Sequence, residues 1–251
     1  MATKDADLSS LRIDGSSPGA GTPRKSRFVR KIIIWLLVLI AVVVFWGFSH
    51  TVNKNLIHPE VQRPWILWVH GIVFSSWLLF FIMQSAFVRA RSVRWHRNVG
   101  WFGAALGVSM IYLGISTTLT MARYYLHQFH RSDANFLIVP FWDISCFAVC
   151  FALAIAWRKK PEHHRRMMLL ATCALTAAGW GRFPLLSNGG FYAGVDFLLV
   201  LGIVRDLIVS RRIHNVYKLG LPIFAAGQAF ALFVVITKPE WWMKFAFAIV
   251  G

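Results

Sequence analysis

The chain has 251 residues, of which 57% are hydrophobic, 15% aromatic and 15% charged. A soluble domain would carry roughly 25% charged residues, so this composition excludes a disordered chain, a coiled coil and an ordinary soluble enzyme. Lys and Arg total 27 against 10 Asp and Glu, which gives a formal net charge of +17. That excess would fit either a nucleic-acid binder or a membrane protein with basic loops, and the positions of the charges decide between the two.

Seven continuous apolar stretches predict an all-α, polytopic transmembrane bundle. A helix that crosses a bilayer needs about 20 mostly apolar residues, and continuous rather than alternating runs argue against membrane strands. The sixth stretch is the weakest, because it contains Asp196, Arg205 and Asp206. The predicted organisation is a disordered cytoplasmic tail over 1–30, the bundle over 31–238 and a short interfacial segment over 239–251. The predicted spans are 32–49, 64–88, 99–122, 136–157, 167–187, 191–209 and 219–237.

The segments between these spans are alternately rich and poor in basic residues, and this pattern orients the chain. If the N-terminus is cytoplasmic, 20 of the 27 basic residues lie inside, and this asymmetry is the one that orients membrane proteins. We therefore expect the N-terminus in and the C-terminus out. The inside residues are spread over several loops rather than one face, so nucleic acid is excluded as a partner and anionic lipid headgroups are expected instead. The outside set is Lys54, Arg63, Arg123, Arg131, Arg182, Lys238 and Lys244.

Four ionisable residues fall inside the predicted spans, where charge is costly and usually functional. His70, Asp143, Arg182 and Asp196 come from four different spans, and at 1.5 Å per residue each lies about 7–11 Å below the outer surface. One interpretation is a polar pocket for a small ligand, in which the two carboxylates neutralise Arg182 and His70 exchanges a proton or ligates a metal or haem. The other is a structural ion pair that closes the bundle.

Small residues and cysteines inside the spans favour packing roles. Gly100, Gly103, Gly107 and Gly114 form a stripe on the third span, and such stripes let helices approach closely. The stripe would pack either within the chain or between copies in a homo- or hetero-oligomer. The three cysteines also lie inside spans and predict no disulfide framework, and no metal site is predicted.

Two His-Arg pairs begin the third and fifth predicted spans. They are His96-Arg97 and His164-Arg165, and each follows a basic inner turn. Paired histidines on neighbouring helices can hold a b-type haem, although the spacing shows no pair of deep histidines that face each other. The alternative is contact between these pairs and lipid phosphates.

The stretch from His70 to Gly107, with Gln84 and the His96-Arg97-x-x-Gly100 element, resembles a group of uncharacterised bacterial multi-spanning membrane proteins. The run 164–172 resembles the same group, and HRxxG at a helix start is more remotely similar to elements of transmembrane b-type cytochromes. The resemblance implies a multi-pass protein of the bacterial inner membrane, and it implies no specific reaction.

Three functions are consistent with these features. The first is a binding or accessory subunit with a polar pocket in the outer leaflet. The second is a b-type haem oxidoreductase or electron-transfer protein, and the third is a proton-coupled transporter. No catalytic residue is assigned, because the chain contains no hydrolase motif such as Gly-x-Ser-x-Gly or His-Glu-x-x-His and no phosphate-binding loop.

Overall fold

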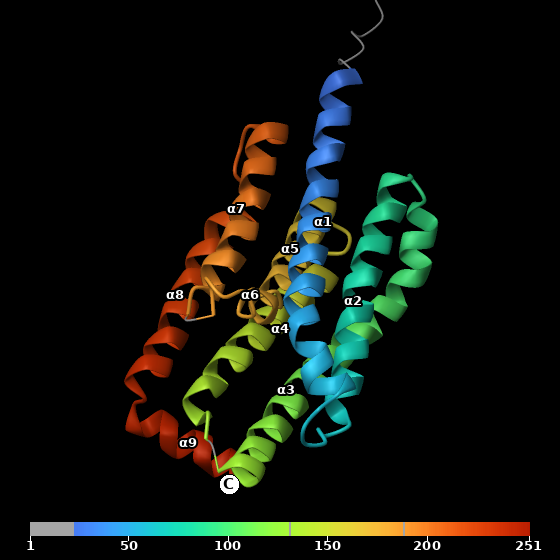
Figure 1. Cartoon of the computed structure of the whole chain (residues 1–251). Coiled ribbons are helices and arrows are strands. Elements are labelled where there is room, and N and C mark those ends of the chain that lie inside the picture. Colours follow the sequence, from blue (N-terminus) through green and yellow to red (C-terminus); the bar gives the residue numbers. More distant parts are fainter. Residues whose placement is uncertain (1–22, 131, 188) are drawn as a thin grey trace, which may run out of the picture.

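The computed structural model describes residues 23–130, 132–187 and 189–251, with side chains from residue 31 onward. Within this part every regular element is a helix and there is no strand, as predicted (Figure 1). Residues 23–30, expected in the tail, already belong to the first helix, and the rest of the predicted tail lies outside the described residues. In chain order the elements are α1 (Pro23–Val52), the π-helical turn η2 (Asn53–Ile57), α2 (Ile66–Arg89), α3 (Val93–Phe129), the 3-10 turn η3 (Ala134–Leu137), α4 (Ile138–Ala156), α5 (Pro161–Ala174), α6 (Ala177–Trp180), α7 (Phe191–Ser210), α8 (Asn215–Thr237) and α9 (Glu240–Val250).

The helices run up and down between two ends of one bundle (Figure 1). We call the end at which α1 begins, α2 ends and α3 begins the proximal end. The distal end is the one at which α1 ends, α2 begins and the C-terminus lies. Most of the described basic side chains that were assigned to the inside belong to the proximal end, because they lie in the 89–97, 158–166 and 205–218 segments.

Five helical segments are long and apolar enough to cross a membrane, and they coincide with the predicted first, second, third, fourth and seventh spans. Large apolar side chains point outward from them, including Trp35, Ile72, Val108 and Phe233. In water such a surface would be unfavourable, but lipid tails are as apolar as these side chains. The five segments are Lys31–Ile57, Ile66–Arg89, Val93–Phe129, Ala134–Ala156 and Asn215–Thr237.

The predicted fifth span, 167–187, is not one continuous helix, and in this respect the prediction is wrong. α5 ends at Ala174, a two-residue turn follows, and α6 has only four residues before a series of turns. The Thr176 hydroxyl donates to the carbonyl of Cys173 at 2.6 Å, a local bond that competes with helix continuation. The sixth span is a continuous helix, α7, although it carries the three charged residues already noted.

The break between α5 and α6 lies against α1. A Cβ atom on Gly47 would overlap the carbonyl oxygen of Gly179, so the two backbones touch in a way that only small residues allow. Just beyond α6, the Nε of Arg182 donates to the Thr51 hydroxyl near the end of α1 at 3.1 Å. The segment that begins with α5 at the proximal end therefore reaches the distal part of α1.

The glycine stripe of α3 packs within the chain. A Cβ on Gly103 would overlap the ring of Phe80 in α2, and Cβ atoms on Gly107 and Gly114 would overlap Phe151 and Ile144 in α4. Gly100 alone of the four has open space beside it. Three of the four predicted packing glycines thus hold α2, α3 and α4 together. An oligomer through this stripe stays a prediction, and of the four glycines Gly100 alone has space for a second chain.

Candidate functional site

The two histidines that begin the third and fifth predicted spans meet at the proximal end. His96 lies in the first turn of α3 and His164 in the first turn of α5. Their ring centroids are 6.1 Å apart and the ring planes are nearly perpendicular, at 81°. The short link between α4 and α5 folds α5 back along α4, and this places His164 beside the start of α3. The two candidate histidines at the helix starts therefore lie side by side.

Hydrogen bonding fixes how the ring of His164 presents itself. Its Nδ1 lies 2.8 Å from the carbonyl oxygen of Ala154. Because a carbonyl can only accept, Nδ1 carries a proton, and in the neutral ring the lone pair is therefore on Nε2. The ring of His96 faces the backbone carbonyl of Gln84, and its Nδ1 is buried without a hydrogen-bond partner. A proton held by a backbone carbonyl on one ring nitrogen is typical of histidines that ligate a metal through the other.

Gln84 adds unpartnered polar atoms to the same end. The side chain is 9% exposed, and both its amide nitrogen and its amide oxygen lack a hydrogen-bond partner. Two turns earlier on this face of α2, the indole nitrogen of Trp77 donates to the Thr172 hydroxyl of α5 at 3.4 Å. His164 precedes Thr172 by about two turns, so Gln84 is at the level of the histidine pair. Buried polar groups in native proteins normally have partners, so Gln84 brings two polar atoms with unused hydrogen-bonding capacity to the level of the histidine pair.

The histidine pair is not part of a larger ligand cluster. In the part of the chain that the structure describes, no three His, Cys, Asp or Glu side chains come together as a group able to hold a metal ion. The neighbouring arginines of the two His-Arg pairs are exposed. Arg97 has no carboxylate partner in the structure, and Arg165 donates to Glu162 at 2.5 Å.

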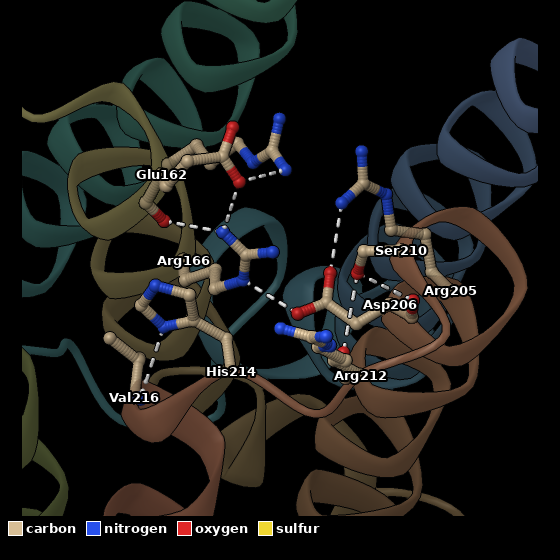
Figure 2. Close-up of polar contacts among 9 residues, drawn as sticks. Glu162, Arg166, Arg205, Asp206, Ser210, Arg212, His214 and Val216 are labelled. Carbon is tan, nitrogen blue, oxygen red and sulfur yellow. Dashed lines mark hydrogen bonds and ion pairs between the residues drawn. The ribbon is translucent and has the colours of Figure 1, made fainter.

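A buried ion network lies beside the pair and was missed by sequence reasoning. Figure 2 shows Arg166 of α5 between Glu162 and Asp206 of α7. Its Nε is 2.7 Å from Asp206 Oδ2 and its Nη1 is 2.7 Å from Glu162 Oε2. Arg205 Nη1 contacts the other oxygen of Asp206 at 2.9 Å. Asp206 is completely buried, and it is the only acidic residue between 197 and 239. That isolation among basic residues was the available signal.

The network also shifts two titrating groups outside the membrane-spanning segments. Burial acts to raise the pKa of Glu162, but the hydrogen bond from Arg166 and the charges of Arg165, Arg166 and Arg205 together lower this pKa below its ordinary value. Burial, aided by the charge of Arg166 and by His163, lowers the pKa of His214. His214 Nδ1 accepts from the Val216 backbone N–H at 3.2 Å and so caps the start of α8.

The four residues of the predicted polar pocket are distributed over three separate contacts. Arg182 interacts electrostatically with His70, Asp143 of α4 interacts with the Tyr192 hydroxyl of α7, and Asp196 interacts with Gln228 of α8. No ion pair joins Arg182 to either carboxylate among the described side chains. The expected neutralisation of Arg182 by Asp143 and Asp196 is thus absent from the structure.

Comparison of the chain with protein-family models, with curated proteins and with solved structures finds no match. The interpretation of the site therefore depends on its own geometry.

Proposed function

We propose that the chain is a multi-pass membrane protein that binds a b-type haem between His96 and His164 and serves in electron transfer. The observation that carries this proposal is the perpendicular ring pair at 6.1 Å, in which Nδ1 of His164 is held by the Ala154 carbonyl and Nε2 is the nitrogen left for a ligand. The predicted pocket in the outer leaflet supports a function less well, because no ion pair among the described side chains joins Arg182 to Asp143 or Asp196.

The ligand count favours a haem over a bare metal ion. A bare ion of the kind that imidazole suits usually has three or four protein ligands, and only two histidines meet here in the described part of the chain. A haem iron already has the nitrogens of its porphyrin, so two histidines would complete its ligand set. At 6.1 Å between centroids, the rings of His96 and His164 are close enough that both could hold the same iron.

Other residues at this end fit the same group. Arg97 and Arg165 would face its propionates, and the unpartnered amide of Gln84 would donate to or accept from it. The similarity of His96-Arg97-x-x-Gly100 to elements of transmembrane b-type cytochromes supports the proposal. When bound, the haem would supply one-electron chemistry, His96 and His164 would hold its iron, and the Ala154 carbonyl would orient the ring of His164 through Nδ1.

For the topology we propose an N-terminus in the cytoplasm and a C-terminus outside, in a bacterial inner membrane. α5 and α6 together would form a broken fifth crossing and α7 the sixth, giving seven crossings. The contact between Arg182 and Thr51 supports this path, because it carries the chain from the proximal end to the distal part of α1. Broken helices are tolerated at membrane depth where the protein itself covers them, and α6 is covered by α1 and α7.

Absorbance of the purified protein from haem-replete cells tests the proposed function. We expect a Soret band that shifts on reduction with dithionite and disappears in His96→Ala and in His164→Ala. His163→Ala is the matched control, because this neighbouring histidine packs against His214 instead, with ring centroids 4.6 Å apart, and the band should persist. A colourless wild-type protein that also takes up no added hemin would contradict the proposal.

A further inference from the structure

The distal end carries a second cluster of cations that the proposed haem site does not use. Its cations are Arg63 in the link before α2 and Arg182 after α6, and His70 of α2 lies beside Arg182. We call these three residues the distal cation cluster. We propose that this cluster binds an oxyanion, that is, the phosphate or carboxylate group of a ligand. The proposal does not depend on the haem site, which lies at the other end of the bundle.

Arg63 has donors that nothing in the described structure satisfies. Its Nη2 donates to the Asn55 side-chain oxygen at 3.2 Å, but its Nε and Nη1 are buried and lack partners. The guanidinium carbon lies 5.2 Å from the ring centroid of Tyr124 and 5.3 Å from that of Tyr125. Aromatic faces position the cation, but they offer no hydrogen-bond acceptor in the plane of the guanidinium, so these two nitrogens stay without a partner.

Arg182 is held in a similar way by neutral groups. Its Nε donates to the Thr51 hydroxyl, its Nη1 donates to the Ala178 carbonyl, and its guanidinium carbon lies 3.8 Å from the ring centroid of Phe48. These contacts fix the guanidinium in place without neutralising its charge. Arg182 is therefore positioned as a preformed cation.

The two arginines belong to one cluster because both approach Tyr125. Arg63 lies over the Tyr125 ring, and Arg182 interacts electrostatically with the same tyrosine. Arg182 also interacts with His70, whose Nδ1 is buried without a hydrogen-bond partner. Two guanidinium groups able to donate to an anion, with His70 beside one of them, are thus grouped around the ends of α1 and α3 and the start of α2.

No carboxylate compensates this charge in the described part of the chain. None of the ion pairs involves Arg63 or Arg182, and Glu240 at this end pairs with Lys244. A planar guanidinium matches the oxygens of phosphate and carboxylate and prefers them to a monatomic anion. Partly buried cations without a counter-charge, together with orphaned donors, therefore point to an oxyanion from outside the chain.

Anion binding is measured on the full-length, detergent-purified protein by isothermal titration calorimetry. Inorganic phosphate and acetate are titrated separately, with sodium chloride at matched ionic strength as the reference. We expect saturable binding of at least one oxyanion to the wild type, weakened at least tenfold in Arg63→Gln and in Arg182→Gln. Lys54→Gln is the matched control, because Lys54 is an exposed cation in the adjoining turn, and its affinity should equal that of the wild type.

Two further measurements complete the test. Circular dichroism and melting of each variant show whether it folds, and Arg63→Gln carries the test if Arg182→Gln does not. The affinity for phosphate is also compared between nanodiscs of phosphatidylglycerol and of phosphatidylcholine. A lower affinity in phosphatidylglycerol identifies a lipid headgroup as the natural ligand. Equal affinity in the two lipids identifies a soluble anion. Absence of saturable oxyanion binding, or equal loss in Lys54→Gln and Arg63→Gln, would overturn the proposal, and neither result depends on a Soret band.

Discussion

At the residue scale, the contact between Arg166 and Asp206 is the strongest polar tie between α5 and α7. Both side chains are almost completely buried, with exposed fractions of 4% and 0%. A buried pair of this kind has a large desolvation cost, so its net contribution to folding can be small. Removing one partner is different, because it leaves the other charge buried and uncompensated.

We therefore expect Asp206→Ala to destabilise the protein by about 3–5 kcal/mol. Arg166 and Arg205 would both lose their shared carboxylate. The matched comparison is Glu162→Gln, whose side chain is 55% exposed and whose loss should cost about 1 kcal/mol or less. Unfolding in mixed micelles with increasing dodecyl sulfate measures both variants, and equal destabilisation by the two would contradict this ranking.

The lowered pKa of His214 predicts that the folded state loses stability as the pH is lowered from neutrality. The unfolded chain takes up a proton near 6.5, while the folded chain resists protonation of His214 to a lower pH, so protons favour the unfolded state in that window. Glu162 does not contribute there, because its carboxyl in the unfolded chain titrates only near 4.5.

His214→Asn isolates this effect, because asparagine also caps a helix start but does not titrate. Between pH 7.5 and 5.5 the melting temperature of the wild type should fall more than that of His214→Asn. Parallel melting curves for the two proteins across this range would show that another group is responsible.

At the element scale, five predicted spans coincide with single apolar helices because the hydrophobic run alone determines them. The fifth does not, because its end depends on contacts that the run does not contain. The Thr176 hydroxyl bonds to its own chain, and Gly179 meets Gly47 some 130 residues earlier. Hydrophobicity gave no signal for this break, although the small residues Ala177, Ala178, Gly179 and Gly181 were visible in the sequence.

The α3 glycines give a prediction with an internal control. Gly107→Ala would force a Cβ into the buried ring of Phe151 and should destabilise the bundle by about 1–3 kcal/mol. Gly100→Ala meets open space and should stabilise it by about 0.4–1 kcal/mol, since alanine restricts the unfolded chain. Unfolding of the two variants in mixed micelles checks the difference, and a loss of stability in Gly100→Ala would instead indicate that this glycine packs against another subunit.

At the scale of the whole molecule, the orientation depends on loop charge, whereas the site depends on how helices pair. The residues His96 and His164 could be singled out from their matching positions after basic turns. The short distance between their rings could not be predicted, because it depends on how α4 and α5 pack together beside α3. The same applies to Arg63 and Arg182, which a charge count treats only as outer cations and which Tyr125 brings into one cluster.

Fusion of reporters to the two termini tests the proposed topology. A fluorescent protein that matures only in the cytoplasm should be active at the N-terminus and dark at the C-terminus. A phosphatase that folds only outside should show the reverse pattern. Activity of one reporter at both termini would contradict an odd number of crossings.

The meeting of Gly47 with Gly179 also affects the order in which the bundle can assemble. α1 leaves the ribosome first, but the backbone that closes against it is made about 130 residues later. At 5–20 residues per second this interval is on the order of ten seconds. During that time Gly47 has no contact from α6, so α1 is in the bilayer before this contact can form. Closure of the bundle, and with it the placement of Arg182 at the distal end, is therefore a late event in biosynthesis.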